Sequence, residues 1–166
     1  MKTKNLVLAA MLAALGLLIP IACGGFLGIT IPPFFSATLA AHVPLFLSMT
    51  LGPWAAVMVA AVGAFGFLIK LGPVIAMRAA SHMVFAAVGA YLYQKGWRFR
   101  NVLIVTAPIH ALCEACVVLA FGFTLKDAGL VVGGGTILHH ILDSIIALGL
   151  YSVLKSFLPK PKTLNA

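Results

Sequence analysis

Long apolar runs follow one another along the whole chain, each ended by glycine and proline or by charged residues. Most runs approach the roughly 20 residues that a helix needs to cross a membrane. The pattern therefore predicts an all-α integral membrane protein, with residues 1–166 forming a single domain and a bundle of six transmembrane helices. We expect the spans at about residues 5–23, 34–51, 54–69, 74–93, 101–123 and 136–154.

The composition supports a membrane protein and excludes several other classes. Hydrophobic residues make up 63% of the chain and charged residues only 8%, against about 45–50% and about 25% in soluble domains. The mean hydropathy is +1.15. Such a chain is neither a soluble enzyme nor a disordered segment, and its three cysteines, an odd number within apolar sequence, argue against a disulfide scaffold.

The basic residues predict the orientation in the bilayer. Eleven lysines and arginines face only three acids, and with six spans eight of the eleven lie on the side of both termini. The positive-inside rule makes that side, and so both the N and C termini, cytoplasmic. The bases occur in small groups between apolar runs, so we expect a lipid bilayer around the chain and no nucleic-acid partner. The eight are Lys2, Lys4, Lys95, Arg98, Arg100, Lys155, Lys160 and Lys162.

Ionisable residues inside the predicted spans are the strongest functional signal, because such groups are costly in lipid and commonly functional. Several are spaced i, i+4, which stacks them on one helix face, and nearly all fall in the outer half of the membrane. They predict a polar, substrate-binding pocket open to the outside. The alternative is that they only hydrogen-bond neighbouring helices together. The candidates are His42, Arg78, His82, His110, Glu114, His139 and Asp143.

Other patterns bear on metals, catalysis and partners. Cys113 and Cys116 have the spacing of a metal site, but on one apolar helix this more often reflects small packing residues, so we expect no bound metal, no cofactor and no catalytic residue. The chain has no phosphate-binding loop or hydrolase motif, so an ATP-driven motor would have to be another chain. Small residues spaced four apart in the first span offer a close-packing helix surface, either for a partner or for the bundle itself. They are Ala9, Ala10, Ala13 and Ala14.

With its length, six predicted spans and the opening Met1-Lys2-Thr3-Lys4 before an alanine-rich helix, the chain resembles the substrate-binding S components of energy-coupling factor (ECF) vitamin transporters. The resemblance implies a bacterial cytoplasmic membrane protein that works with a transmembrane coupling subunit and two ATP-binding subunits. It also implies that Ala9, Ala10, Ala13 and Ala14 dock onto the coupling subunit. Residues 24–36 would be an external loop that closes over the substrate.

The segment from His42 to Phe46, the pair Gly52-Pro53 and the segment from Arg78 to His82 look most like the niacin-type members. The resemblance thus implies a high-affinity capture subunit for a small water-soluble vitamin or precursor, niacin being the best guess, and not an enzyme. Glu114 and Asp143 would repel a carboxylate unless they are protonated, paired with Arg78 or bonded to a ring nitrogen, so pyridoxine-like or pyrimidine ligands stay open. Alternatives are an ion or metal transporter with His, Cys and carboxylate ligands, and a small intramembrane enzyme with an acid–base pair of His110 and Glu114.

Overall fold

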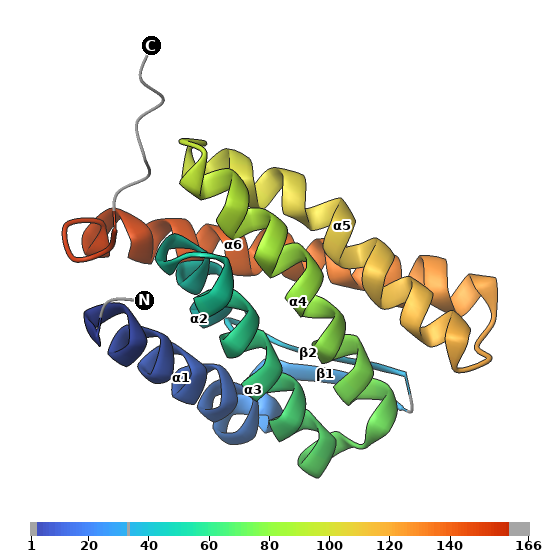
Figure 1. The fold of residues 1–166 in the computed structure, drawn as a ribbon. Helices are drawn as coiled ribbons and strands as arrows, with labels where there is room; N and C mark the ends of the chain where they lie inside the picture. Colours follow the sequence, from blue (N-terminus) through green and yellow to red (C-terminus); the bar gives the residue numbers. More distant parts are fainter. Residues whose placement is uncertain (1–2, 33, 160–166) are drawn as a thin grey trace.

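The structure, a computed structural model, describes residues 3–32 and 34–159 and is a helical bundle with one short hairpin beside the helices (Figure 1). In chain order the elements are α1 (Thr3–Leu27), β1 (Gly28–Ile31), β2 (Phe35–Thr38), α2 (Val43–Ser48), the 3-10 turn η1 (Met49–Leu51), α3 (Pro53–Leu71), α4 (Pro73–Gln94), α5 (Phe99–Ala120), the π-helical η2 (Asp127–Gly134) and α6 (Gly135–Leu154).

Five helical segments in the described part of the chain are long and apolar enough to cross a membrane: α1, α3, α4, α5 and η2 together with α6. They match five of the six predicted spans. Large apolar side chains cover their outer faces, for example Phe65, Ile104 and Leu138, each more than 60% exposed. Because water disfavours such a surface and lipid does not, the chain is a multi-pass membrane protein.

The second predicted span, 34–51, is wrong as a single helix. Its first part is β2, which pairs antiparallel with β1 from Gly28 opposite Thr38 to Ile31 opposite Phe35. Ala40 then adopts a left-handed conformation with φ 68°. The backbone N–H groups of Ala40 and His42 are donated to the Asp143 carboxylate of α6, so helix begins only at Val43.

The hairpin occupies the place where the resemblance predicts an external loop at residues 24–36, although α1 extends through residue 27 before β1 starts. Figure 1 shows the hairpin running alongside the helices and α2 leading back toward the end of the bundle that holds the N-terminus. The segment 35–51 thus returns along the bundle as a strand followed by a short helix.

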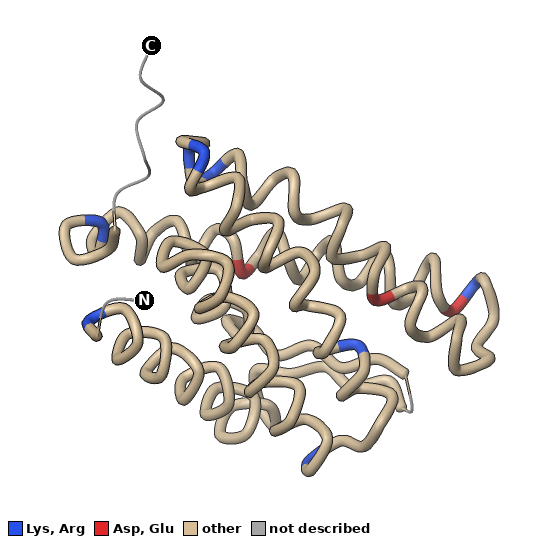
Figure 2. The backbone as a smooth tube through the Cα atoms, in the orientation of Figure 1, with Lys and Arg blue, Asp and Glu red and all other residues tan. Residues whose placement is uncertain are grey.

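Both ends of the described chain lie at one end of the bundle (Figure 1). The Lys4 Nζ donates a hydrogen bond to the Phe157 carbonyl at 3.0 Å, and the Tyr93 hydroxyl at the end of α4 lies 3.0 Å from that of Tyr151 in α6. Figure 2 shows lysines and arginines gathered at this end, where the charge pattern of the sequence predicts them. Lys2, Lys160 and Lys162 lie outside the described residues.

A Gly-Pro pair stands at the start of both α3 and α4. Gly52 precedes Pro53, the first residue of α3, and Gly72 precedes Pro73, the first residue of α4. Gly52 and Gly72 have φ values of 114° and 84°, a region that glycine enters without steric cost. The prolines that follow fix φ near −65° and need no N–H partner in a first helical turn. These pairs therefore set where each helix starts.

Gly89 of α4 marks the closest packing in the core, which is formed at this level by Met49, Phe46 and Phe85, all fully buried. A Cβ on Gly89 would lie 2.5 Å from the Met49 Sδ and 3.1 Å from the Thr106 Cγ2. Only glycine therefore allows α4, α5 and η1 to approach this closely.

We predict that Gly89→Leu destabilises the fold by at least about 1–3 kcal/mol through overpacking, measured as a lower thermal unfolding midpoint in detergent. Gly149→Leu in α6 is the matched control, because nothing lies within 4 Å of a Cβ at that exposed position. Equal midpoints for the two variants would contradict the packing argument.

Candidate functional site

A cavity of about 60 Å³ lies between the hairpin and the helices. Gly16 of α1 and five residues of α3 form an apolar side, and β2, α4, α5 and α6 supply polar groups. The polar side chains that line it are Ser36, Thr38, His42, Arg78, His82, Glu114, Thr136 and His139.

Glu114 of α5 is the centre of a buried polar cluster on one side of the cavity. Its Oε2 accepts hydrogen bonds from the Arg78 Nη2 at 2.5 Å and from the Thr136 hydroxyl. Its Oε1 lies 2.8 Å from the His82 Nε2 and 3.4 Å from the His110 Nε2. Since Glu114 and Arg78 are each only 4% exposed in their side chains, the two charges compensate one another inside the protein.

Arg78 retains unused hydrogen-bonding capacity despite this pairing. Its Nη1 donates to the Phe34 carbonyl at 3.0 Å, and the guanidinium lies 5.0 Å from the centre of the Phe35 ring. Its Nε has no hydrogen-bond partner within residues 3–32 and 34–159. Of the five N–H groups of a guanidinium, the two bonds to Phe34 and Glu114 use two. The remaining groups make no hydrogen bond within the described residues.

Asp143 of α6 holds the turn between β2 and α2 and does not line the cavity. Besides the two backbone N–H groups of Ala40 and His42, its carboxylate accepts hydrogen bonds from the His42 Nδ1 at 3.2 Å and the His139 Nε2 at 3.1 Å. The His139 Nε2 also lies 2.9 Å from the Thr38 carbonyl. Through these contacts α6 fixes both His42 and His139 against the hairpin.

His110 stands behind the cavity wall and is fully buried. Its Nδ1 lies 3.0 Å from the Nδ1 of His140, whose Nε2 lies 3.0 Å from the Leu103 carbonyl. His110 thus connects the Glu114 cluster to α6.

The structure brings all seven residues predicted for the pocket into one region. Five of them line the cavity, and His110 and Asp143 support it from behind. The sequence reasoning missed Thr136 and Thr38, whose neutral hydroxyl groups do not stand out in an apolar span. It also missed the wall formed by α3, which includes Val59, Ala60 and Phe67 and carries no polar signal at all.

The small residues of α1 divide into two pairs. Ala9 and Ala13 are buried in the core, whereas Ala10 and Ala14 are exposed. Only the second pair therefore lies on a face that another helix could approach.

The fold and the site together define a multi-pass membrane protein with a small cavity lined by a buried, charge-compensated polar cluster. The chain is 35% identical to the niacin transporter NiaX of Lactococcus lactis subsp. cremoris, over 95% of this chain and 78% of that protein. It therefore belongs to the family of niacin-type vitamin transport proteins, which confirms the resemblance predicted from the sequence. No protein-family model matches the chain. No solved structure matches it either.

Proposed function

We propose that the chain is the substrate-capture subunit of an energy-coupling factor transporter and that its ligand is niacin. One observation carries this proposal: Arg78, a buried cation, lines a small cavity and still has N–H groups to donate. The relationship to a niacin transporter supports the same ligand.

Nicotinate is a flat aromatic ring with one carboxylate, and the cavity offers a partner for each part. The carboxylate would accept hydrogen bonds from the unused N–H groups of Arg78. The ring would lie against the apolar side formed by Val59, Ala60 and Phe67 of α3. Glu114 does not oppose this, because its charge is already compensated by Arg78 and its oxygens are occupied by donors.

We predict that the double variant Arg78→Gln/Glu114→Gln folds but loses nicotinate affinity by at least about tenfold, the equivalent of one charge-assisted hydrogen bond of about 1.5–3 kcal/mol. Removing both charges together avoids leaving either one unpaired in the interior. Isothermal titration calorimetry of the purified protein with nicotinate measures the loss.

Two comparisons sharpen this test. Lys126→Ala removes an exposed cation outside the cavity and is expected to bind nicotinate like the wild type. Nicotinamide, which lacks the carboxylate, should bind the wild type more weakly than nicotinate. Unchanged nicotinate affinity in the double variant would contradict the role given to Arg78.

The transport role adds a topology and partners to this proposal. The chain would cross the bacterial cytoplasmic membrane six times, with the segment 35–51 as its second crossing and both termini in the cytoplasm. The basic residues at the end of the bundle that holds the N-terminus support this orientation by the positive-inside rule. A membrane-embedded coupling subunit and two ATP-binding subunits would then supply the energy, with Ala10 and Ala14 on the exposed face of α1 as the docking surface.

A further inference from the structure

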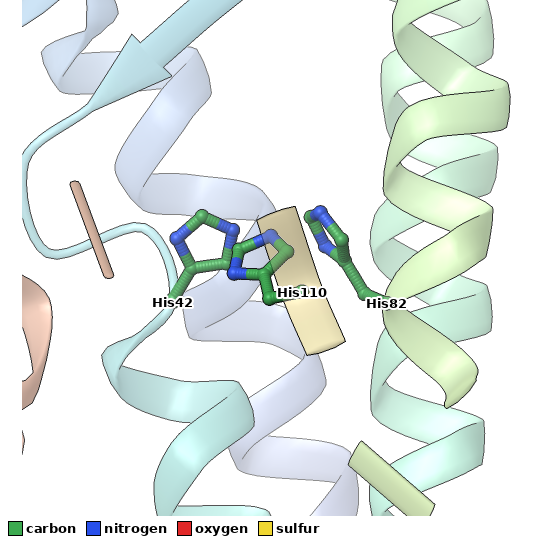
Figure 3. A group of neighbouring side chains, drawn as sticks. All are labelled: His42, His82 and His110. Carbon is green, nitrogen blue, oxygen red and sulfur yellow. The ribbon is translucent and has the colours of Figure 1, made fainter. Parts of the chain in front are cut away.

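Three histidines from three different elements meet beside the cavity. His42 precedes α2, His82 belongs to α4 and His110 to α5. Their ring centroids lie 4.6–4.8 Å apart, and one ring nitrogen from each lies within 4.8 Å of the other two. Figure 3 shows the three rings gathered around a common point.

The hydrogen bonds of His42 and His82 fix where their protons lie. The His42 Nδ1 faces the Asp143 carboxylate and the His82 Nε2 faces the Glu114 carboxylate. A carboxylate that is ionised can only accept, so each of these nitrogens carries the hydrogen. In a ring with one N–H group, the second nitrogen then has a lone pair that is free to bind a metal ion.

A chain of hydrogen bonds gives the same result for His110. The Leu103 carbonyl can only accept, so the His140 Nε2 donates to it and the His140 Nδ1 is left as an acceptor. The His110 Nδ1 must then donate to the His140 Nδ1. Its own Nε2 is consequently unprotonated, which explains why this buried atom makes no hydrogen bond although the Glu114 oxygen is only 3.4 Å away.

We propose that His42, His82 and His110 form a binding site for a divalent transition metal ion of the zinc and cobalt class. Imidazole nitrogens are preferred ligands of these ions. Metal-binding histidines usually donate their other ring N–H to a carboxylate or another acceptor, which orients the ring. Here Asp143, Glu114 and His140 are those acceptors.

The separations suit such an ion after small side-chain movements. Metal–nitrogen bonds of about 2.0–2.1 Å place tetrahedral ligands about 3.3–3.4 Å apart. One nitrogen of each ring already lies within 4.8 Å of the others, so small movements of the rings are enough to bring the three histidines onto one ion. Three protein ligands leave a fourth position open. Because two of the three ligands, His42 and His82, line the cavity, we expect that position to face the ligand pocket.

A second group of possible ligands, His42 with His139 and Asp143, is less suited to a metal. The Nε2 of His139 lies between two acceptors, the Thr38 carbonyl and the Asp143 carboxylate, so it carries a hydrogen and has no lone pair to offer there. The Asp143 oxygens already accept from two backbone N–H groups. We therefore assign the metal site to His42, His82 and His110. The expectation of no bound metal rests on the spacing of Cys113 and Cys116, and this site uses neither cysteine.

The consequence for transport rests on the proposed function. A metal ion whose open position faces the pocket provides a ligand-binding point for an anionic carboxylate or a pyridine nitrogen, the two electron-pair donors of nicotinate. We therefore expect nicotinate to bind more tightly to the metal-loaded protein than to the metal-free protein.

Cobalt titration tests the site directly. The full chain is purified in detergent without a polyhistidine tag, stripped with EDTA and titrated with Co²⁺. The absorption bands of Co²⁺ report tetrahedral coordination, and Zn²⁺ is then added to displace it. One ion per chain is expected. His82→Ala and His110→Ala should each weaken Co²⁺ binding by more than about 100-fold, the upper end of the loss for a merely supporting residue. Lys126→Ala, an exposed position away from the cavity, should bind Co²⁺ like the wild type.

Two results would overturn the site. The first is a wild-type chain that takes up no Co²⁺, a result that does not depend on whether any variant folds. Loss of binding in His139→Ala with retention in His82→Ala would place the ion on the other group.

Nicotinate titrations of the stripped and loaded protein separate the two proposals. Co²⁺ binding without any nicotinate binding would overturn niacin as the ligand and leave the metal site in place. Nicotinate binding by a chain that takes up no metal would overturn the metal site and leave the proposed function in place.

Discussion

Glu114→Ala is expected to lower the free energy of unfolding by about 3–5 kcal/mol, the loss seen when one partner of a buried ion pair is removed. The substitution leaves the Arg78 guanidinium in the interior with, among the described residues, only the Phe34 carbonyl as its hydrogen-bond acceptor. It also removes the acceptor of the His82 and Thr136 hydrogen bonds. Thermal and denaturant-induced unfolding of the purified protein in detergent measure the loss.

Two comparisons identify the cause of this destabilisation. Asp127→Ala removes an acid whose side chain, among the described residues, accepts only from the Thr124 hydroxyl, and it should cost about 1 kcal/mol, as for a helix cap. Adding Arg78→Gln to Glu114→Ala should restore part of the stability, because the unpaired cation is then gone. A double variant less stable than Glu114→Ala by the full effect of Arg78→Gln alone would show that the two residues do not act as a pair.

The helices could be predicted from the sequence because each is a local pattern of about 20 apolar residues, bounded by signals such as Gly72-Pro73. The segment 34–51 could not. Its conformation depends on Asp143, which lies 103 residues beyond Ala40 and accepts its backbone N–H. A hydropathy pattern carries no information about such a distant contact, so the segment 34–51 resembles an ordinary span in the sequence.

The candidate site was predictable to the extent that it consists of ionisable residues in lipid. Arg78, Glu114 and the histidines stand out because charges are rare in apolar spans, and their meeting in one region follows from their similar depth. The pairing of Arg78 with Glu114, left open by the sequence, is present in the structure. It removes the repulsion that a lone carboxylate would exert on an anionic ligand.

Other parts of the site leave no trace in the sequence. Thr136 is a neutral residue in an apolar run, and the α3 wall differs in no way from a surface that faces lipid. The proton positions on His110 and His140 depend on the Leu103 carbonyl, a backbone group present at every residue. Only the folded arrangement distinguishes these groups from their neighbours.

The largest expected effect on transport comes from α1. Replacing the exposed Ala10 and Ala14 together with tryptophan should abolish niacin uptake in cells while leaving nicotinate binding by the isolated protein unchanged. In lipid, helices associate through close packing, because no hydrophobic effect drives them together. Two indole rings on this face would hold a partner helix several ångströms away, and neither alanine lines the cavity. Radiolabelled uptake and calorimetry measure the two properties separately.

The matched control is Ala22→Trp, which places the same ring on an exposed position of the same helix near its other end. It should leave both uptake and binding intact. Ala9→Trp and Ala13→Trp should instead reduce folding and binding together, since both alanines are buried in the bundle core. Normal uptake by the Ala10/Ala14 variant would remove the mechanical basis for docking through α1. Loss of nicotinate binding together with uptake would mean that this face of α1 supports the pocket and does not serve a partner.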